Sequence, residues 1–141
     1  MAKKQKLKIE EEYEFTLIGI SSHVKDYKIC SAFNNELDFN FVRIDDLEIH
    51  SPNSENNPSF CTFFFENEEN HTKYYLISNK SENGYLIPED KNSDYFLIIY
   101  GPFEDSEITS LISEIKAVDN VITAYETDVN KLKSKQVFLL L

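Results

Sequence analysis

The sequence has few of the residues that cross-link or interrupt a fold. Its 141 residues include two cysteines, three glycines, four prolines and no tryptophan. Two cysteines are too few for a secreted disulfide scaffold, and no glycine-rich phosphate loop is present. With 41% hydrophobic and 13% aromatic residues, the chain can bury a core of its own and is not disordered as a whole.

Long hydrophobic runs are missing as well. The longest, such as residues 95–100 and 137–141, have about five or six residues, against the ~20 that a membrane-spanning helix needs. The amino-terminal residues are basic but lack the apolar stretch and cleavage site of a signal peptide. We therefore expect no membrane as a partner and a cytoplasmic protein with both thiols reduced.

The charge is strongly negative and unevenly distributed. Fourteen lysines and arginines face 25 acidic residues, and the net charge is -11. Residues 1–8 and 129–141 contain lysines and no acid, so the chain between them is still more acidic. Such a body repels phosphate backbones, and we expect no nucleic-acid partner. The predicted organisation is a flexible basic terminus over residues 1–8 and a single α+β domain over 9–141.

Two stretches have the pattern strand–helix–strand. Residues 14–20 are apolar on both alternating faces, which is typical of a central strand. Ser21 or Ser22 is expected to cap a helix that runs to about Leu37, with a strand over 39–44 after it.

The second stretch begins at residues 95–100, another strand that is apolar on both faces. Ile108, Leu111, Ile112 and Ile115 have the spacing of an amphipathic helix, and residues 121–125 read as the closing strand. Between the two stretches, 60–65 and 73–78 are predicted strands, and Asn83-Gly84 is a hairpin signal.

These patterns predict an α+β fold, with two split β-α-β halves in a ferredoxin-like sandwich and an inserted antiparallel β-meander. In that fold the first strands of the two halves pair at the centre of the sheet. Because Phe63, Phe64 and Phe65 are consecutive, at least one ring must point away from the helices. The apolar residues 137–141 are expected to form a short strand, or a clasp across the open sheet face or across a second subunit.

One short motif lies at the entry to the second central strand. It consists of Ile87, Pro88, Glu89, Asp94 and Tyr95. The chain resembles the IPExxxVDY family of small uncharacterised bacterial proteins, found mainly in Bacteroidetes, with Ser93 where the family has valine. The resemblance implies a bacterial source and no known activity. Physically, the two carboxylates are expected to accept N–H bonds within the turn and Tyr95 to anchor the strand; the alternative is acid–base work or metal binding.

The turn from Gly19 to His23 is a second candidate site. Gly19, Ser21, Ser22 and His23 join a strand to a predicted helix N-terminus, where free N–H groups attract anions. Arg43 or the Glu89/Asp94 loop would supply a second partner for the ligand. The alternative is that Ser22 only caps its own helix.

No metal, cofactor or catalytic residue is predicted. Cys30 and Cys61 could be combined with His23, His50 or His71, but the spacings of zinc sites are absent. The sequence favours a non-enzymatic protein-interaction or self-association module over an enzyme, because seven aromatic residues between 60 and 85 suggest an uncovered sheet face. The alternative is a regulatory, ACT-like domain or an enzyme that uses the Gly19–His23 turn for a small anion.

Overall fold

The protein is a mixed α/β structure built on one antiparallel sheet. The computed structural model describes residues 15–50, 57–82, 84–101 and 103–141, so the basic residues 1–8 lie outside it. The sheet has six strands in the order β2-β3-β4-β7-β1-β8. Their bounds are β1 Thr16–Ser22, β2 Val42–Glu48, β3 Ser59–Asn67, β4 Thr72–Ser78, β7 Tyr95–Tyr100 and β8 Val121–Thr127. All neighbouring pairs run antiparallel.

The two strands that the sequence predicts to pair, β1 and β7, do pair, but β1 lies next to the edge strand β8 and not at the middle of the six-stranded sheet. β1 pairs with β7 from Thr16 opposite Ile99 to Ile20 opposite Tyr95. Ile18 and Ile20 pack in the core beneath the helices, whereas Leu17 packs on the opposite face. Because both faces are covered, a continuous apolar run is the expected sequence of such a strand.

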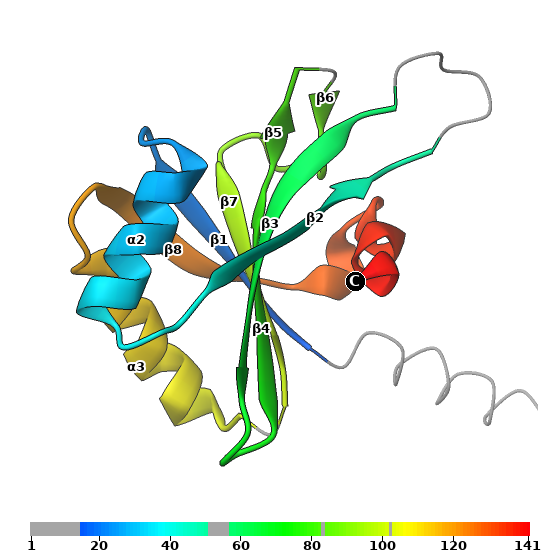
Figure 1. Ribbon diagram of the computed structural model, residues 1–141. Coiled ribbons are helices and arrows are strands. Elements are labelled where there is room, and N and C mark those ends of the chain that lie inside the picture. Colours follow the sequence, from blue (N-terminus) through cyan, green and yellow to red (C-terminus); the bar gives the residue numbers. More distant parts are fainter. Residues whose placement is uncertain (1–14, 51–56, 83, 102) are drawn as a thin grey trace, which may run out of the picture.

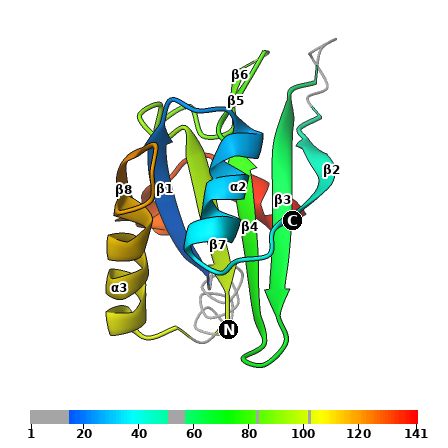
Figure 2. The same cartoon turned by 60° about the vertical axis from the view of Figure 1, so that its left-hand side comes forward.

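Two helices cover one face of the sheet, α2 from Asp26 to Glu36 and α3 from Asp105 to Lys116 (Figures 1 and 2). Three residues of α3 are buried with the predicted spacing, Ile108, Leu111 and Ile115. Glu104 and Glu107 form a capping box at its start, which satisfies backbone N–H groups that have no partner in the first turn.

The predicted start of the first helix is wrong. Ser21 and Ser22 belong to β1, and α2 begins after Lys25, an N-cap without a side-chain cap bond. The Ser22 hydroxyl donates to the carbonyl of Asn120 at 2.6 Å, and its N–H donates to Asp94. These bonds from distant segments hold the serine in the strand, so it does not cap the helix.

The aromatic middle of the chain forms the β3–β4 hairpin. Phe63 and Phe65 pack in the core beneath the helices, and Phe64 contacts Tyr75 on the other face, with ring centroids 4.9 Å apart. One ring therefore points away from the helices, as predicted. A small hairpin follows, with β5 Lys80–Ser81 paired to β6 Gly84–Tyr85; Asn83 lies outside the described residues.

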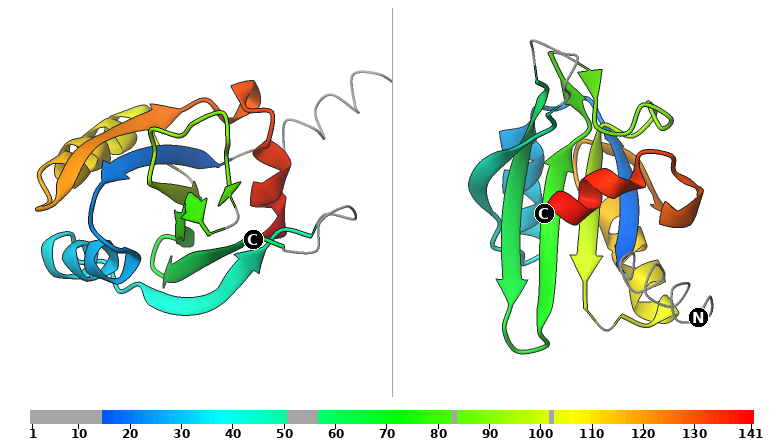
Figure 3. Two further views of the ribbon diagram at one scale, coloured as in Figure 1. Left: turned by 90° about the horizontal axis from the view of Figure 1, so that it is seen from above. Right: turned by 90° about the vertical axis from the view of Figure 1, so that its right-hand side faces the viewer.

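The sequence suggested an uncovered second face of the sheet, but in the structure this face is covered. Two 3-10 turns, η1 Val129–Lys131 and η2 Lys135–Leu140, lie across it (Figure 3). Phe138 is fully buried against Phe96 and Phe15, with ring centroids 6.0 and 5.7 Å away. The carboxyl-terminal residues 129–141 thus pack across the chain's own sheet and do not form a strand. We call this segment the carboxyl-terminal clasp.

No helix in the described part of the chain is long and apolar enough to cross a membrane.

Candidate functional site

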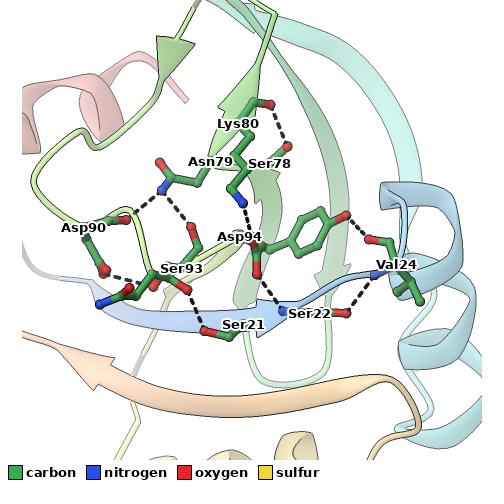
Figure 4. A network of polar contacts seen from close by, with 11 residues as sticks. Ser21, Ser22, Val24, Ser78, Asn79, Lys80, Asp90, Ser93 and Asp94 are labelled. Atoms are coloured by element: carbon green, nitrogen blue, oxygen red, sulfur yellow. Dashed lines mark hydrogen bonds and ion pairs between the residues drawn. The ribbon is translucent and has the colours of Figure 1, made fainter.

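The loop that carries the motif is organised around a buried side chain, Asn79, which lies between β4 and β5 (Figure 4). Its amide donates to the carbonyls of Asp90 and Ser93, each at 2.8 Å. Its carbonyl oxygen accepts from the backbone N–H of Ile87 at 2.7 Å. All three side-chain polar positions therefore hold the loop in one conformation.

Asp94 of the motif reaches out of its own loop to the end of β1. One carboxylate oxygen accepts from the N–H of Ser22 at 2.8 Å, and the other lies 2.6 Å from the ammonium of Lys80. The prediction that this carboxylate binds N–H groups within its own turn is therefore wrong. It joins two segments that are 72 residues apart in sequence.

A second polar cluster binds the loop to β8. The Ser93 hydroxyl lies 2.6 Å from the hydroxyl of Tyr125 and donates to Asp90 at 2.9 Å. Tyr125 also contacts both carboxylate oxygens of Asp90, at 2.9 and 3.0 Å. A Cβ on Gly19 would lie 2.4 Å from the Ser93 oxygen. Gly19 is thus needed because the cluster sits directly against the backbone of β1.

Glu89 attaches the carboxyl-terminal clasp. Its carboxylate accepts from the N–H of Ser134 at 2.7 Å and from the Ser134 hydroxyl at 2.9 Å. Burial alone would raise the pKa of Glu89, but hydrogen bonds from backbone N–H groups and from Ser134 lower it below its ordinary value. The backbone N–H of Glu89 itself is one of these donors, as the prediction of bonds within the turn requires, whereas Ser134 lies outside the turn.

The last motif residue, Tyr95, anchors the strand as predicted. Its hydroxyl donates to the carbonyl of Val24 at 2.5 Å. Burial, followed by the charge of Asp26, raises its pKa well above the usual range. The motif is therefore a set of attachments that hold β1, α2, β7 and the carboxyl-terminal clasp together.

The predicted anion site lies beside this network, and its polar groups are already bound. The Ser21 hydroxyl donates to the carbonyl of Asn92 at 2.6 Å, and both polar groups of Ser22 are engaged as described. His23 is exposed and lines a cavity of about 280 Å³ together with Lys25, Lys80 and Asp94. The Asp94 carboxylate, which is paired with Lys80, also lines this cavity and would repel an anion. Binding at this turn stays a prediction.

The other residues considered as partners lie elsewhere. Arg43 is on the edge strand β2 and pairs with Asp46 at 3.1 Å. Four strand spacings separate β2 from β1, a distance of about 19 Å. No group of three or more His, Cys, Asp or Glu residues suited to a metal ion occurs among the described residues. The two cysteines are buried free thiols.

A groove that the sequence did not reveal opens between α3 and the segment that directly follows α2. Its cavity of about 410 Å³ has an apolar floor, formed by Leu37, Phe39, Tyr74, Phe103 and Leu111. The ring of Tyr74 lies 5.0 Å from that of Phe39 and 6.2 Å from that of Phe103. The floor is thus largely aromatic and continuous with the packed core.

The rim of this groove is acidic. Glu107 and Glu114 of α3 line it, and an adjoining cavity of about 310 Å³ adds Glu36 and Asp38 at the end of α2. No Lys, Arg or His lines either cavity, and within the described residues none of the four carboxylates is in an ion pair. Burial and then the Glu107 charge raise the pKa of Tyr74. The groove therefore combines an apolar floor with uncompensated negative charge.

No family model matches the chain, and a comparison with curated proteins finds no match. The resemblance to the IPExxxVDY proteins therefore stays a prediction.

Sequence reasoning found the motif but missed most of its partners. Asn79, Lys80 and Tyr125 lie outside it, and Asp90 and Ser93 occupy positions that the family name leaves open or fills with valine. Ser93 is fully buried, so its hydroxyl needs the partners that Asp90 and Tyr125 supply. The groove could not be found from the sequence, because its floor and rim come from three segments that are far apart along the chain.

Proposed function

We propose that the protein is a non-enzymatic protein-interaction module that binds partners in the groove between α3 and the segment that follows α2. The observation that carries the proposal is an aromatic floor bordered by four carboxylates, with no Lys, Arg or His among the described residues that line the two cavities. Apolar side chains of a partner would cover the floor, and lysines or arginines would neutralise the rim. The partner is thus a cationic, amphipathic segment of another protein.

The rim has unused capacity for such a partner. Glu107 accepts one weak bond from Glu104, and Glu36 accepts one from Asp119, at 3.5 and 3.4 Å. An ionised carboxylate has about four lone-pair sites, so each can accept further N–H donors. Placing cations here also relieves repulsion among the acids.

The test uses a labelled synthetic helix of leucine and lysine with one apolar face, in fluorescence anisotropy. Replacing Glu36 and Glu114 together by lysine is expected to weaken binding by about tenfold or more, because two attractive charges become repulsive. The chain carries a net charge of -11 and will attract any polycation. The matched control therefore replaces Glu68 and Glu69 by lysine, because both are exposed in the β3–β4 turn. This control changes the net charge by the same amount as the substitutions in the groove.

A scrambled peptide of the same composition tests the floor, because it keeps the charge and loses the apolar face. We expect it to bind more weakly to the wild-type protein. Equal weakening by the groove and turn substitutions would show that the attraction is only nonspecific, and the proposal would then fail. It would also fail if the ordered peptide did not bind.

We also propose, as the sequence suggested, that the fold is a ferredoxin-like sandwich and that the protein is cytoplasmic. If the β3–β4 hairpin is left out, the strand order is β2-β7-β1-β8, which supports a ferredoxin-like sandwich with an inserted hairpin. The two reduced cysteines suit the cytoplasm.

A further inference from the structure

The two edges of the sheet differ in how well they are protected against pairing with another strand. The outer strand β2 carries Arg43, Asp45, Asp46 and Glu48, and its register with β3 shifts between Ile44 and Leu47. Charges and a bulge are the usual means by which an edge strand avoids association. β2 is therefore protected against pairing with another strand.

The opposite edge, β8, carries a single charge, Glu126 near its end. Its first five residues, 121–125, are uncharged and rich in β-branched side chains, which suit strand pairing. Ile122 is 58% exposed. The pairing of β8 with β1 also shifts register, but at the start of the strand, between Val121 and Thr123, and the pairing from Thr123 to Thr127 is regular. Among the described strands only β1 pairs with β8, so its outer edge can take up another strand.

The helix beside this edge, α3, has one flank whose charges can pair with those of a second copy of the same helix. α3 lies at the β8 end of the sheet, with α2 on its other side (Figure 2). Its groove flank carries Glu107 and Glu114. At about 100° per residue, its opposite flank carries Asp105 near the start, the half-buried Ile112, and Lys116 at the end.

We propose that a second copy of the chain pairs with this one along β8. A two-fold axis perpendicular to the sheet makes the two β8 strands antiparallel and joins two six-stranded sheets into one. The same axis makes the two α3 helices antiparallel. Asp105 of each copy then lies toward Lys116 of the other, and the two Ile112 side chains lie near the axis. The charge pattern of α3 thus fits a second copy of this chain.

The interface is independent of the groove, because the two lie on opposite flanks of α3. Sedimentation velocity over a range of concentrations tests it on the full chain. We expect the wild-type protein to dimerise and Ile122→Lys to raise the dimer dissociation constant by about tenfold or more, since it replaces an apolar side chain of the pairing edge by a charge, a usual means by which edge strands avoid association. The matched control is Val42→Lys, which places the same charge on the β2 edge at a residue that is 54% exposed; this variant should dimerise as the wild type does.

A charge exchange tests the antiparallel arrangement of the helices. Lys116→Asp alone is expected to weaken the dimer, and Asp105→Lys with Lys116→Asp to restore it, with circular dichroism confirming that α3 still folds. A wild-type monomer at high micromolar concentration would overturn the proposal. A dimer that survives Ile122→Lys, or one that only Val42→Lys disrupts, would overturn it too, and failure of the charge exchange would reject the antiparallel α3 contact.

Discussion

Replacing Asn79 by alanine is expected to be among the most damaging single changes outside the apolar core. The substitution removes two donors and one acceptor from a fully buried position. The N–H of Ile87 and the carbonyl of Ser93 belong to residues that are themselves fully buried, so water cannot replace the lost partner without opening the loop. The carbonyl of Asp90 is nearer to solvent and adds less.

The magnitude follows from those two groups. Leaving a buried polar group without a partner costs about 1–3 kcal/mol, so we expect Asn79→Ala to lower the free energy of unfolding by about 3–4 kcal/mol. In a chain of this size that corresponds to a melting temperature lower by about 10 °C. Asn79→Asp should cost at least as much at neutral pH, because a carboxylate cannot donate to the carbonyls of Asp90 and Ser93.

Urea denaturation followed by circular dichroism measures this difference. Asn92→Ala is the matched control, because Asn92 lies in the same loop with an exposed side chain, and surface changes usually stay within about 0.5 kcal/mol. If Asn79→Ala and Asn92→Ala differed by less than about 1 kcal/mol, the idea that this amide organises the loop would be wrong.

Three further predictions concern the clasp and the thiols. Phe138→Ala should lower the free energy of unfolding by about 3–5 kcal/mol, whereas Leu140→Ala, at a side chain that is 60% exposed, should change it little in the same urea assay. The pKa of Glu89 is lower in the folded than in the unfolded chain, so its stabilising contribution is complete above the unfolded pKa and is lost as the pH falls through the folded one. Unfolding measured below about pH 4 should therefore depend less on pH in Glu89→Gln, and an unchanged profile would show that the bond to Ser134 contributes nothing. Burial raises the pKa of Cys61 to about 12, so iodoacetamide at pH 8 should modify it only after unfolding, as mass spectrometry would show.

The interior strands β1 and β7 and the helix α3 could be predicted because their signals are local. A continuous apolar run suits a strand covered on both faces, as β7 is, and three buried positions at helical spacing define α3. The same holds for the three consecutive phenylalanines Phe63–Phe65. Side chains along a strand alternate between the two faces of the sheet, so at least one of these rings must face away from the helices.

Only the tertiary structure decided which polar groups meet. Ser22 is a good helix cap by type, yet Asp94, 72 residues away, binds its N–H and Asn120 accepts its hydroxyl. Glu89 binds Ser134 across 45 residues, and the clasp that this bond attaches covers the face that looked open from the sequence. Hydrogen bonds depend on distance and angle, and for residues so far apart both are fixed by the packing of the sheet, which no local pattern encodes.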